Sequence, residues 1–219
     1  MNICKAKGWS LEIFYFKELA STQIHLMENI GEYRVPALIY TRNQTDGIGS
    51  RNNEWQGVEG NLFFSFVLSE EMLPKDLSTS SVSVYFGYLI KDILASLGSQ
   101  SYLKWPNDFY LGEQKIGGLI TNKKSDLFYI GVGINLVENA HKLHFLDINL
   151  DIKCFFNELK TKINDLISWK DIFHQYKTEF YKNDDHFVHI KGHKQNLREC
   201  ELNEDGSITI NSEKVYSLR

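Results

Sequence analysis

The pattern of apolar and polar positions predicts strands in the first third of the chain and helices in the middle. Residues 10–16 alternate and are rich in aromatic side chains, which predicts a strand, and further strands are predicted over 35–40 and 61–68. Ser21 could cap a short helix between the first two strands. Apolar residues then fall at helical spacing over 82–97, before Gly98 as a C-terminal stop.

The rest of the chain continues with short strands and two helices, and after the helices the hydrophobic pattern changes. Strands are predicted over 102–105, 109–111, 115–121 and 127–136, the last ending in a turn at 131–135, and helices over 152–166 and 169–181. After Asn183 the runs become short and alternating. We therefore expect an α+β main domain over 1–183 and a small β domain over 184–219, too short to be stable alone.

Residues 41–60 lose the hydrophobic period and hold Gly47, Gly49, Gly57 and Gly60 among polar side chains. A loop of this length in a compact domain is usually functional or mobile. Its glycines free backbone N–H groups to face an anion, and Arg51 adds a charged donor. By itself, however, a G-x-G pattern is a weak signal.

Composition and charge limit the class of protein. The net charge is −4 and the sequence pI is about 6.0, with 42% hydrophobic and 24% charged residues, so a general nucleic-acid binder is not expected. Three cysteines without C-x-x-C spacing fit a reducing cytoplasm. No apolar run suggests a signal peptide or a membrane span, so we expect a soluble intracellular protein.

Two segments combine residue types that suit a ligand site. In the first, Pro106 ends a strand while Lys104, Asn107 and Asp108 present a cation, an amide and a carboxylate together. An alternative is a Pro-Asn-Asp turn with Trp105 in the core. In the second, Lys115 begins a strand just before two adjacent glycines, which often mark the close approach of a ligand. The alternative is a solvated lysine at the end of a hairpin.

Other catalytic and metal-binding patterns are missing. The sequence holds neither a Walker-type G-x-x-x-x-G-K-[ST] motif nor G-x-S-x-G, so a P-loop and an esterase-type serine are excluded. The histidine groups 141/144 and 186/189/193 lack supporting ligands in recognisable order, and we interpret them as surface residues. No metal site is therefore predicted from a protein motif.

Taken in order, five segments resemble the biotin protein ligase family. They are Ser21-Thr22-Gln23, Gln44 with Gly47-x-Gly49 and Trp55, Lys104 to Asp108, Lys115-x-x-Gly118, and Gly131 to Leu136. K-W-P-N-D is the most specific of them, and the end of the chain, Tyr216 to Arg219, is similar to the family's C-terminal domain. Because the pattern already starts at Trp9, we expect the N-terminal DNA-binding domain of many bacterial members to be absent.

The resemblance implies a fold and an activity. The fold is a mixed, largely antiparallel sheet backed by helices, with a small barrel-like C-terminal β domain. The activity is the formation of biotinyl-AMP from biotin and Mg-ATP, followed by transfer of biotin to a lysine of a biotin carboxyl carrier protein, of acetyl-CoA carboxylase or another biotin-dependent carboxylase. We expect neither DNA nor membrane as a partner, and a monomer or a homodimer.

The resemblance also assigns roles to residues. Lys115 would contact the biotin carboxylate and the α-phosphate, and Asp108 would help hold the acceptor lysine or the Mg²⁺ that comes with ATP. The expected catalytic residues are Lys115, Asp108, Lys104 and Arg51. The expected biotin-binding residues are Ser21, Thr22, Gln23, Gln44, Gly47, Lys115, Gly117 and Gly118. The expected ATP-binding residues are Gly49, Ser50, Arg51, Trp55, Lys104, Asn107 and Asn135.

One departure from the family concerns its loop, which commonly reads G-R-G-R-x-G-R-x-W. Here Ile48 and Ser50 replace the two early arginines. Since those arginines help order the loop over the intermediate, we expect weaker retention of biotinyl-AMP, or substitution of one of them by Arg51. Equal release rates from wild type, Ser50→Arg and Arg51→Ala would contradict this expectation.

Two alternatives remain besides an uncharacterised α/β domain. A lipoate or octanoate ligase or transferase shares the fold and the lysine but normally lacks K-W-P-N-D together with G-I-N. A non-catalytic biotin or adenylate sensor could lose the reactive lysine, whereas Lys115 is present.

Overall fold

A seven-stranded sheet organises the molecule. The computed structural model describes residues 8–49, 53–55, 57–138, 144–182, 187–190 and 193–216. The sheet order is β1-β2-β5-β9-β8-β7-β6, with β1 and β2 parallel and every other neighbouring pair antiparallel. The strands are β1 Glu12–Phe16, β2 Ala37–Thr41, β5 Leu62–Ser69, β6 Tyr102–Lys104, β7 Asp108–Leu111, β8 Gln114–Lys124 and β9 Leu127–Ile134. The predicted mixed, largely antiparallel sheet is confirmed.

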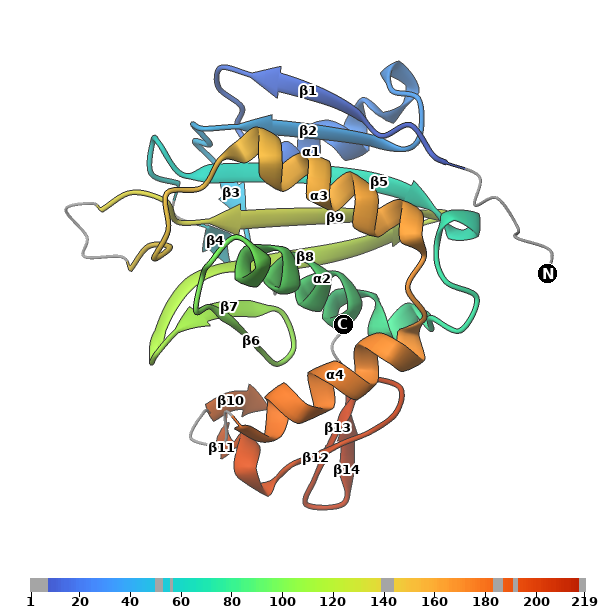
Figure 1. The fold of residues 1–219 in the computed structure, drawn as a ribbon, viewed down its shortest axis with the longest axis vertical. Helices are drawn as coiled ribbons and strands as arrows, with labels where there is room; N and C mark the ends of the chain where they lie inside the picture. The colour runs from blue at the N-terminus through green and yellow to red at the C-terminus, as the bar shows by residue number, and fades with distance from the viewer. Residues whose placement is uncertain are drawn as a thin grey trace.

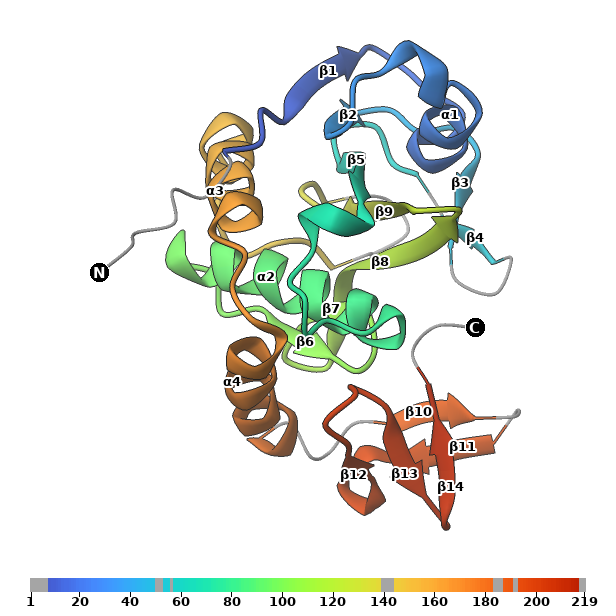
Figure 2. The same ribbon diagram turned by 90° about the vertical axis from the view of Figure 1, so that its right-hand side faces the viewer.

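The two faces of the sheet are covered differently. The helices are α1 Thr22–Glu28, α2 Val82–Ser96, α3 Ile152–Asp165 and α4 Trp169–Lys182. In Figures 1 and 2, α2 and α3 lie on one face, while α1 and the short strands β3 (Gly47–Ile48) and β4 (Glu54–Trp55) lie on the other. As predicted, Ser21 caps α1, and its hydroxyl accepts from the backbone N–H of Ile24.

The helical face holds the larger part of the core. Phe64 of β5 packs edge-on against Phe155 and Phe156 of α3, with ring centroids 5.7 and 5.3 Å apart, and Phe66 meets Phe86 of α2 at 5.2 Å. All five rings are buried. None of the helices within the described ranges has the length and apolar composition needed to cross a lipid bilayer.

The C-terminal part forms two small sheets that follow α4 (Figure 2). Their strands are β10 Phe187–Ile190, β11 His193–Asn196, β12 Glu201–Leu202, β13 Ile208–Ile210 and β14 Glu213–Val215. The short alternating runs after Asn183 predicted strands in this part of the chain, and the structure has them. The boundary proposed near Asn183 falls outside the described residues, so the division into two domains remains a prediction.

The interpretation of residues 131–135 as a turn is wrong. Gly131 to Ile134 lie inside β9, where they pair with β5 on one side and β8 on the other. Backbone pairing on both sides keeps this glycine-containing segment extended, although glycine itself weakens a strand. The loop over 41–60 also contains more order than predicted, because β3 and β4 pair antiparallel within it.

Candidate functional site

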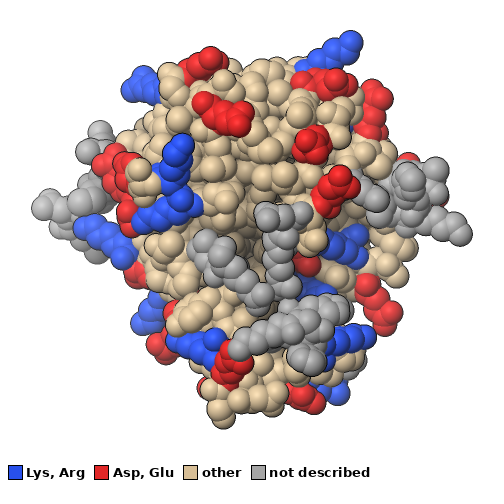
Figure 3. All heavy atoms as spheres, turned by 180° about the vertical axis from the view of Figure 1, so that it is seen from behind, with Lys and Arg blue, Asp and Glu red and all other residues tan. Residues whose placement is uncertain are grey.

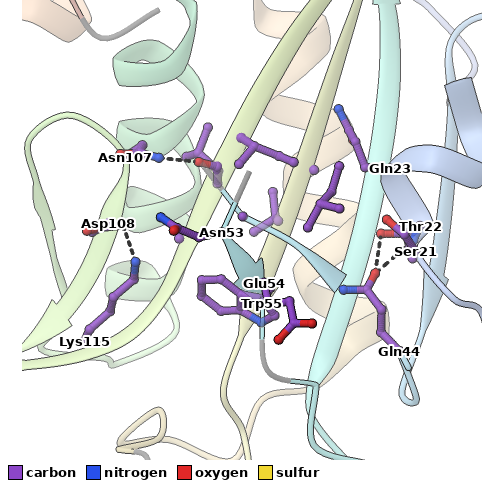
Figure 4. A pocket seen from close by; sticks show the side chains of 18 residues that line it. Ser21, Thr22, Gln23, Gln44, Asn53, Glu54, Trp55, Asn107, Asp108 and Lys115 are labelled. Atoms are coloured by element: carbon purple, nitrogen blue, oxygen red, sulfur yellow. Dashed lines mark hydrogen bonds and ion pairs between the residues drawn. The ribbon is translucent and has the colours of Figure 1, made fainter. Parts of the chain in front are cut away.

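A cavity of about 120 Å³ opens on the α1 face of the sheet. Figure 4 shows that its walls come from α1, the β3–β4 loop and the middle of the sheet. The lining residues are Ser21, Thr22, Gln23, Gln44, Ile48, Gly49, Asn53, Glu54, Trp55, Asn107, Asp108, Lys115, Gly118, Leu119, Ile120, Gly131, Val132 and Gly133. Segments far apart in the sequence therefore meet at one site.

Glycines on the sheet create the room for this cavity. Gly133 pairs with Gly118 across β9 and β8, and Gly131 pairs with Ser65 across β9 and β5. A Cβ atom at Gly131 would lie 2.6 Å from Oε1 of Gln23, and one at Gly133 would lie 2.8 Å from the Trp55 ring. Any side chain at either position would collide with the walls.

The α1 end of the cavity is a buried polar network. The backbone N–H and the hydroxyl of Thr22 donate to Oε1 of Gln44 at 2.9 and 3.2 Å, and the Ser65 hydroxyl donates to the Thr22 hydroxyl at 3.0 Å. Each of the three side chains is less than 10% exposed. The network fixes the direction of the Gln44 amide, because its oxygen already faces two donors of Thr22.

Two lining side chains hold buried polar atoms without partners. Gln23 donates from Nε2 to Asn122 Oδ1 at 3.0 Å and to the Tyr129 carbonyl at 3.1 Å, which leaves Oε1 unpaired. Trp55 Nε1 is likewise buried without an acceptor in the described structure. Buried polar groups without partners are costly and uncommon, and two of them in the lining of one cavity are typical of a binding site.

The opposite end of the cavity is charged. Lys115 Nζ lies 2.7 Å from Asp108 Oδ1, as drawn in Figure 4. The Lys115 side chain is 41% exposed, so its ammonium group can meet an incoming ligand. The same ammonium lies 5.2 Å from the centre of the Trp55 ring, close enough for a cation–π interaction.

A β-bulge explains why Lys115 faces the cavity. Asp108 pairs with Gly118 and Phe109 with Gly117, but Tyr110 pairs with Lys115, so Ile116 has no partner on β7. Cross-strand partners point to the same face, which places Lys115 and Gly118 together although they are three residues apart. In a regular strand they would point to opposite faces. Ile116 is instead buried in the core.

The loop over the cavity is described in part. Gly49 donates its N–H to the Asn53 carbonyl at 2.7 Å, and Trp55 lies between Gly133 and the Lys115 ammonium. Gly47 is buried, and a Cβ there would lie 2.5 Å from Nε2 of Gln44. The predicted residues Ser50 and Arg51 fall outside the described residues.

Two residues of the K-W-P-N-D segment line the cavity, and a third does not. Asn107 lines it and donates from Nδ2 to the Leu119 carbonyl at 2.6 Å, and Asp108 follows at the start of β7. Lys104 turns to Tyr110, donating to its hydroxyl at 3.1 Å from a position 4.5 Å from the ring centre. Burial lowers the pKa of Lys104, against the opposing effect of Asp108, and burial raises the pKa of Tyr110.

Three other predicted residues lie away from the cavity lining or only behind it. Gly117 faces the core, where a Cβ would lie 2.7 Å from the Gly133 carbonyl. Gly47 is not in the lining, but it lies next to Gln44, whose amide nitrogen a Cβ at Gly47 would meet. The side chain of Asn135 accepts from Asn61 Nδ2 at 3.2 Å and donates to the His144 carbonyl at 3.0 Å, so both of its polar atoms hold neighbouring chain.

The structure adds lining residues that were not predicted as site residues: Ile48, Asn53, Glu54, Leu119, Ile120, Gly131, Val132 and Gly133. The spacing of Gly131 and Gly133 was a usable signal, since two glycines separated by one residue leave a hollow on one face of a strand. The others carried no chemical signal in the sequence.

The surface around the cavity carries both signs of charge. In Figure 3, which shows this face, basic and acidic side chains are interspersed rather than gathered by sign. Within the described ranges no group of three or more His, Cys, Asp or Glu could hold a metal ion. His141 and His186, which belonged to the two histidine groups, lie outside those ranges.

Comparison with known proteins gives a consistent family. The sequence pattern of the biotin/lipoate A/B protein ligase family matches residues 14–135. Biotin–protein ligase 2 of Arabidopsis thaliana is 31% identical over 163 residues, which cover 70% of this chain and 49% of that protein. The bifunctional ligase/repressor BirA of Escherichia coli is 32% identical over 123 residues, which cover 53% and 38%. The chain thus spans less than half the length of these two relatives.

A solved structure is similar to this chain over most of its length. It is the biotin acetyl coenzyme A carboxylase synthetase of Helicobacter pylori with bound biotinylated ATP. The TM-score is 0.90 at 38% sequence identity, and the match covers 94% of this chain and 100% of that one. The likeness therefore includes the C-terminal sheets as well as the main sheet.

Proposed function

Since the chain belongs to the biotin/lipoate A/B protein ligase family, we propose that it activates biotin with ATP to biotinyl-AMP and transfers biotin to a lysine of a carrier protein. The observation that carries this proposal is the pairing of a buried hydroxyl and amide network with an accessible lysine across one cavity. Biotin has matching ends, namely a cyclic urea rich in hydrogen-bonding groups and a carboxylate. The resemblance to a structure with biotinylated ATP supports the same choice.

In this proposal the urea ring lies at the α1 end. Gln44 is held with its oxygen on Thr22, so its amide nitrogen can donate to the ligand, and the Ser21 and Thr22 hydroxyls line the same end. The apolar wall that Ile120 supplies then contacts the hydrocarbon part of biotin. Trp55 closes the cavity above Gly133.

The carboxylate end lies at Lys115, where the first reaction takes place. A biotin carboxylate oxygen attacks the α-phosphorus of ATP, a P–O bond forms, and pyrophosphate leaves. Two unit negative charges at about 4 Å repel by about 4 kcal/mol at an effective dielectric near 20. The Lys115 ammonium can offset much of that repulsion and stabilise the charge that grows in the transition state.

The second reaction forms the product amide. The neutral amine of the carrier lysine attacks the acyl carbon of biotinyl-AMP, the acyl C–O bond to the phosphate breaks so that AMP leaves, and the amine proton passes to the solvent. Asp108 is the carboxylate that pairs with Lys115 at this end of the cavity, and we assign to it the positioning of the incoming amine. Lys104, Asn107 and the loop residues Gly49, Ser50 and Arg51 are assigned to the nucleotide side, and Asn135 to a supporting position.

Mg²⁺ fits this site as a companion of ATP. The described residues provide Asp108 but no cluster of three ligands, and Mg²⁺ in nucleotide sites commonly takes most of its ligands from phosphate and water. The acceptor in this proposal is a carrier protein of a biotin-dependent carboxylase. The compartment is a reducing cytoplasm, with which the unpaired Cys154 and Cys200 are compatible.

The proposal is tested with the pure 219-residue chain, Mg-ATP and a biotin carrier domain. We expect biotin-dependent ATP–pyrophosphate exchange and biotin on a single lysine of the carrier, detected by mass spectrometry. Lipoate and octanoate serve as parallel substrates, because the family includes lipoate ligases. Exchange with lipoate but not with biotin would replace this proposal by the lipoate alternative, and binding of biotin without any exchange would favour a sensor.

A further inference from the structure

Three side chains of the main part of the molecule donate hydrogen bonds to one turn of the C-terminal part, residues 204–206. Trp169 Nε1 donates to the Glu204 carbonyl at 2.8 Å, Ser81 Oγ donates to the Asp205 carbonyl at 2.7 Å, and Trp105 Nε1 donates to the Gly206 carbonyl at 2.9 Å. Three successive carbonyls are thus held by donors from α4, the start of α2 and the K-W-P-N-D segment.

The turn is a rigid partner for these donors. Asp205 accepts from the backbone N–H and the hydroxyl of Ser207, and forms an ion pair with Lys214 at 2.8 Å. Gly206 has a φ of +74°, a conformation that favours glycine, and its N–H donates to the Asn203 carbonyl. Its Cα faces the Trp169 ring, which a Cβ would meet at 3.3 Å.

On the other side, Trp105 lies three residues before the charged end of the cavity. Trp105 is 4% exposed. Between it and Asp108, Asn107 is tied to β8 in both directions, since it donates to the Leu119 carbonyl and its own carbonyl accepts from the Leu119 N–H at 2.9 Å. The segment 105–108 is therefore held from the C-terminal turn at one end and from β8 at the other.

We infer that the turn 204–206 is a positioning element of the proposed active site. Acting through Trp105, it sets the place of Asp108, whose 2.7 Å ion pair holds the Lys115 ammonium where the proposed adenylation needs it. The C-terminal part then contributes to the reaction without touching a substrate. This inference depends on the proposed biotin adenylation. Small displacements of reacting groups have large effects on rate. The hydrogen bond from Trp105 Nε1 to the Gly206 carbonyl therefore affects the rate although it lies outside the cavity.

The chain offers a matched pair of substitutions. Trp105→Phe and Trp169→Phe each remove one indole N–H donor to the same turn and keep an aromatic ring, but only Trp105 adjoins the cavity. For Trp105→Phe we expect the kcat of biotin-dependent ATP–pyrophosphate exchange to fall about tenfold with little change in the KM for biotin. For Trp169→Phe we expect a change of less than about twofold, with a similar loss of thermal stability in both variants.

Two further variants distinguish the positioning of Asp108 through Trp105 from a general loss of stability. Gly206→Ala disturbs the turn without altering Trp105, and we expect the same fall in kcat at unchanged KM. In an Asp108→Asn background, Trp105→Phe should lower kcat by less than about twofold, because its effect passes through Asp108.

The outcomes are distinct. Equal kcat values for Trp105→Phe and Trp169→Phe, or full additivity of Trp105→Phe with Asp108→Asn, overturn the inference. If Trp105→Phe does not fold, Gly206→Ala decides, and wild-type kinetics from that variant overturn it. Absence of exchange in the wild type would instead count against the proposed function, and is recognised before any variant is compared.

Discussion

The two faces of the central sheet differ at the place where the cavity lies. On the helical face, β5 and β9 carry large apolar side chains, such as Phe64 and Ile130, that fill the space beneath α2 and α3. On the α1 face, Val67 and Tyr129 of the same strands pack in a smaller apolar cluster, but Ser65, Gly131 and Gly133 leave the space above them open. Large side chains on one face of these strands thus form the core, and small or absent side chains on the other face leave the cavity, because successive residues of a strand point to opposite faces.

This difference teaches why stability and function separate in the chain. Removal of a large side chain from the helical face leaves a void that the packed helices cannot close. Addition of a small side chain on the α1 face fills space that a ligand needs. The two faces should therefore respond in opposite ways to changes in size, and this can be measured.

The largest expected effect is on the helical face. Phe64→Ala removes a fully buried ring that contacts two rings of α3, and we expect a loss of about 3–5 kcal/mol in the free energy of unfolding, measured by urea denaturation. The control is Tyr15→Ala on the edge strand β1, whose side chain is 57% exposed, with an expected loss of less than about 1 kcal/mol. Similar losses from both would contradict a core concentrated under the helices.

The second effect is chemical and should leave stability almost unchanged. Lys115→Ala removes the cation at the charged end of the cavity, and we expect biotin-dependent ATP–pyrophosphate exchange to fall by about 10²- to 10³-fold. The melting temperature should stay close to that of the wild type, because the ion pair with Asp108 is partly exposed. Lys124→Ala, at the exposed end of the same strand, is the control.

Formation of biotinyl-AMP by Lys115→Ala at the wild-type rate would remove the lysine from the proposed chemistry. A large loss of folding stability in this variant would instead show that the charged end of the cavity supports the fold.

The third effect tests whether the cavity depends on the absence of a side chain on β9. Gly131→Ala places a Cβ 2.6 Å from Gln23 Oε1 and 3.2 Å from Ile120, so both walls must move. We expect biotin affinity, measured by calorimetry, to fall about tenfold, or about 1.4 kcal/mol. Gly31→Ala, where a Cβ meets nothing within 4 Å, is the matched control and should bind biotin as the wild type does. Equal affinities in the two variants would contradict a cavity that depends on Gly131.

Much of this arrangement could be predicted from the sequence, since regular patterns and specific motifs carry local information. The periodicity predicted α2, α3 and most strands, and the motifs predicted that Ser21, Gln44, Asp108 and Lys115 share one site. The sequence pattern did not predict that Gly131 to Ile134 remain extended, because the partners that hold them come from β5 and β8. Nor did it predict the bulge at Ile116, which depends on the register between β7 and β8. Strand pairing is a tertiary property, and it decided both.

The smallest effect concerns Lys104, the motif lysine that lies off the cavity. Burial lowers its pKa below the ordinary value of 10.5, so between that lowered pKa and 10.5 the unfolded chain binds more protons than the folded one. Stability due to this group therefore rises with pH across that window. We expect Lys104→Met to lose stability relative to the wild type as the pH rises from 8 to 10, measured by urea unfolding. Because burial raises the pKa of Tyr110, the pair is best compared in a Tyr110→Phe background, which removes that titration. If the difference in the free energy of unfolding between the two proteins stayed constant or changed in the opposite direction, the Lys104 ammonium would be solvated, as the partly exposed Lys115 ammonium is.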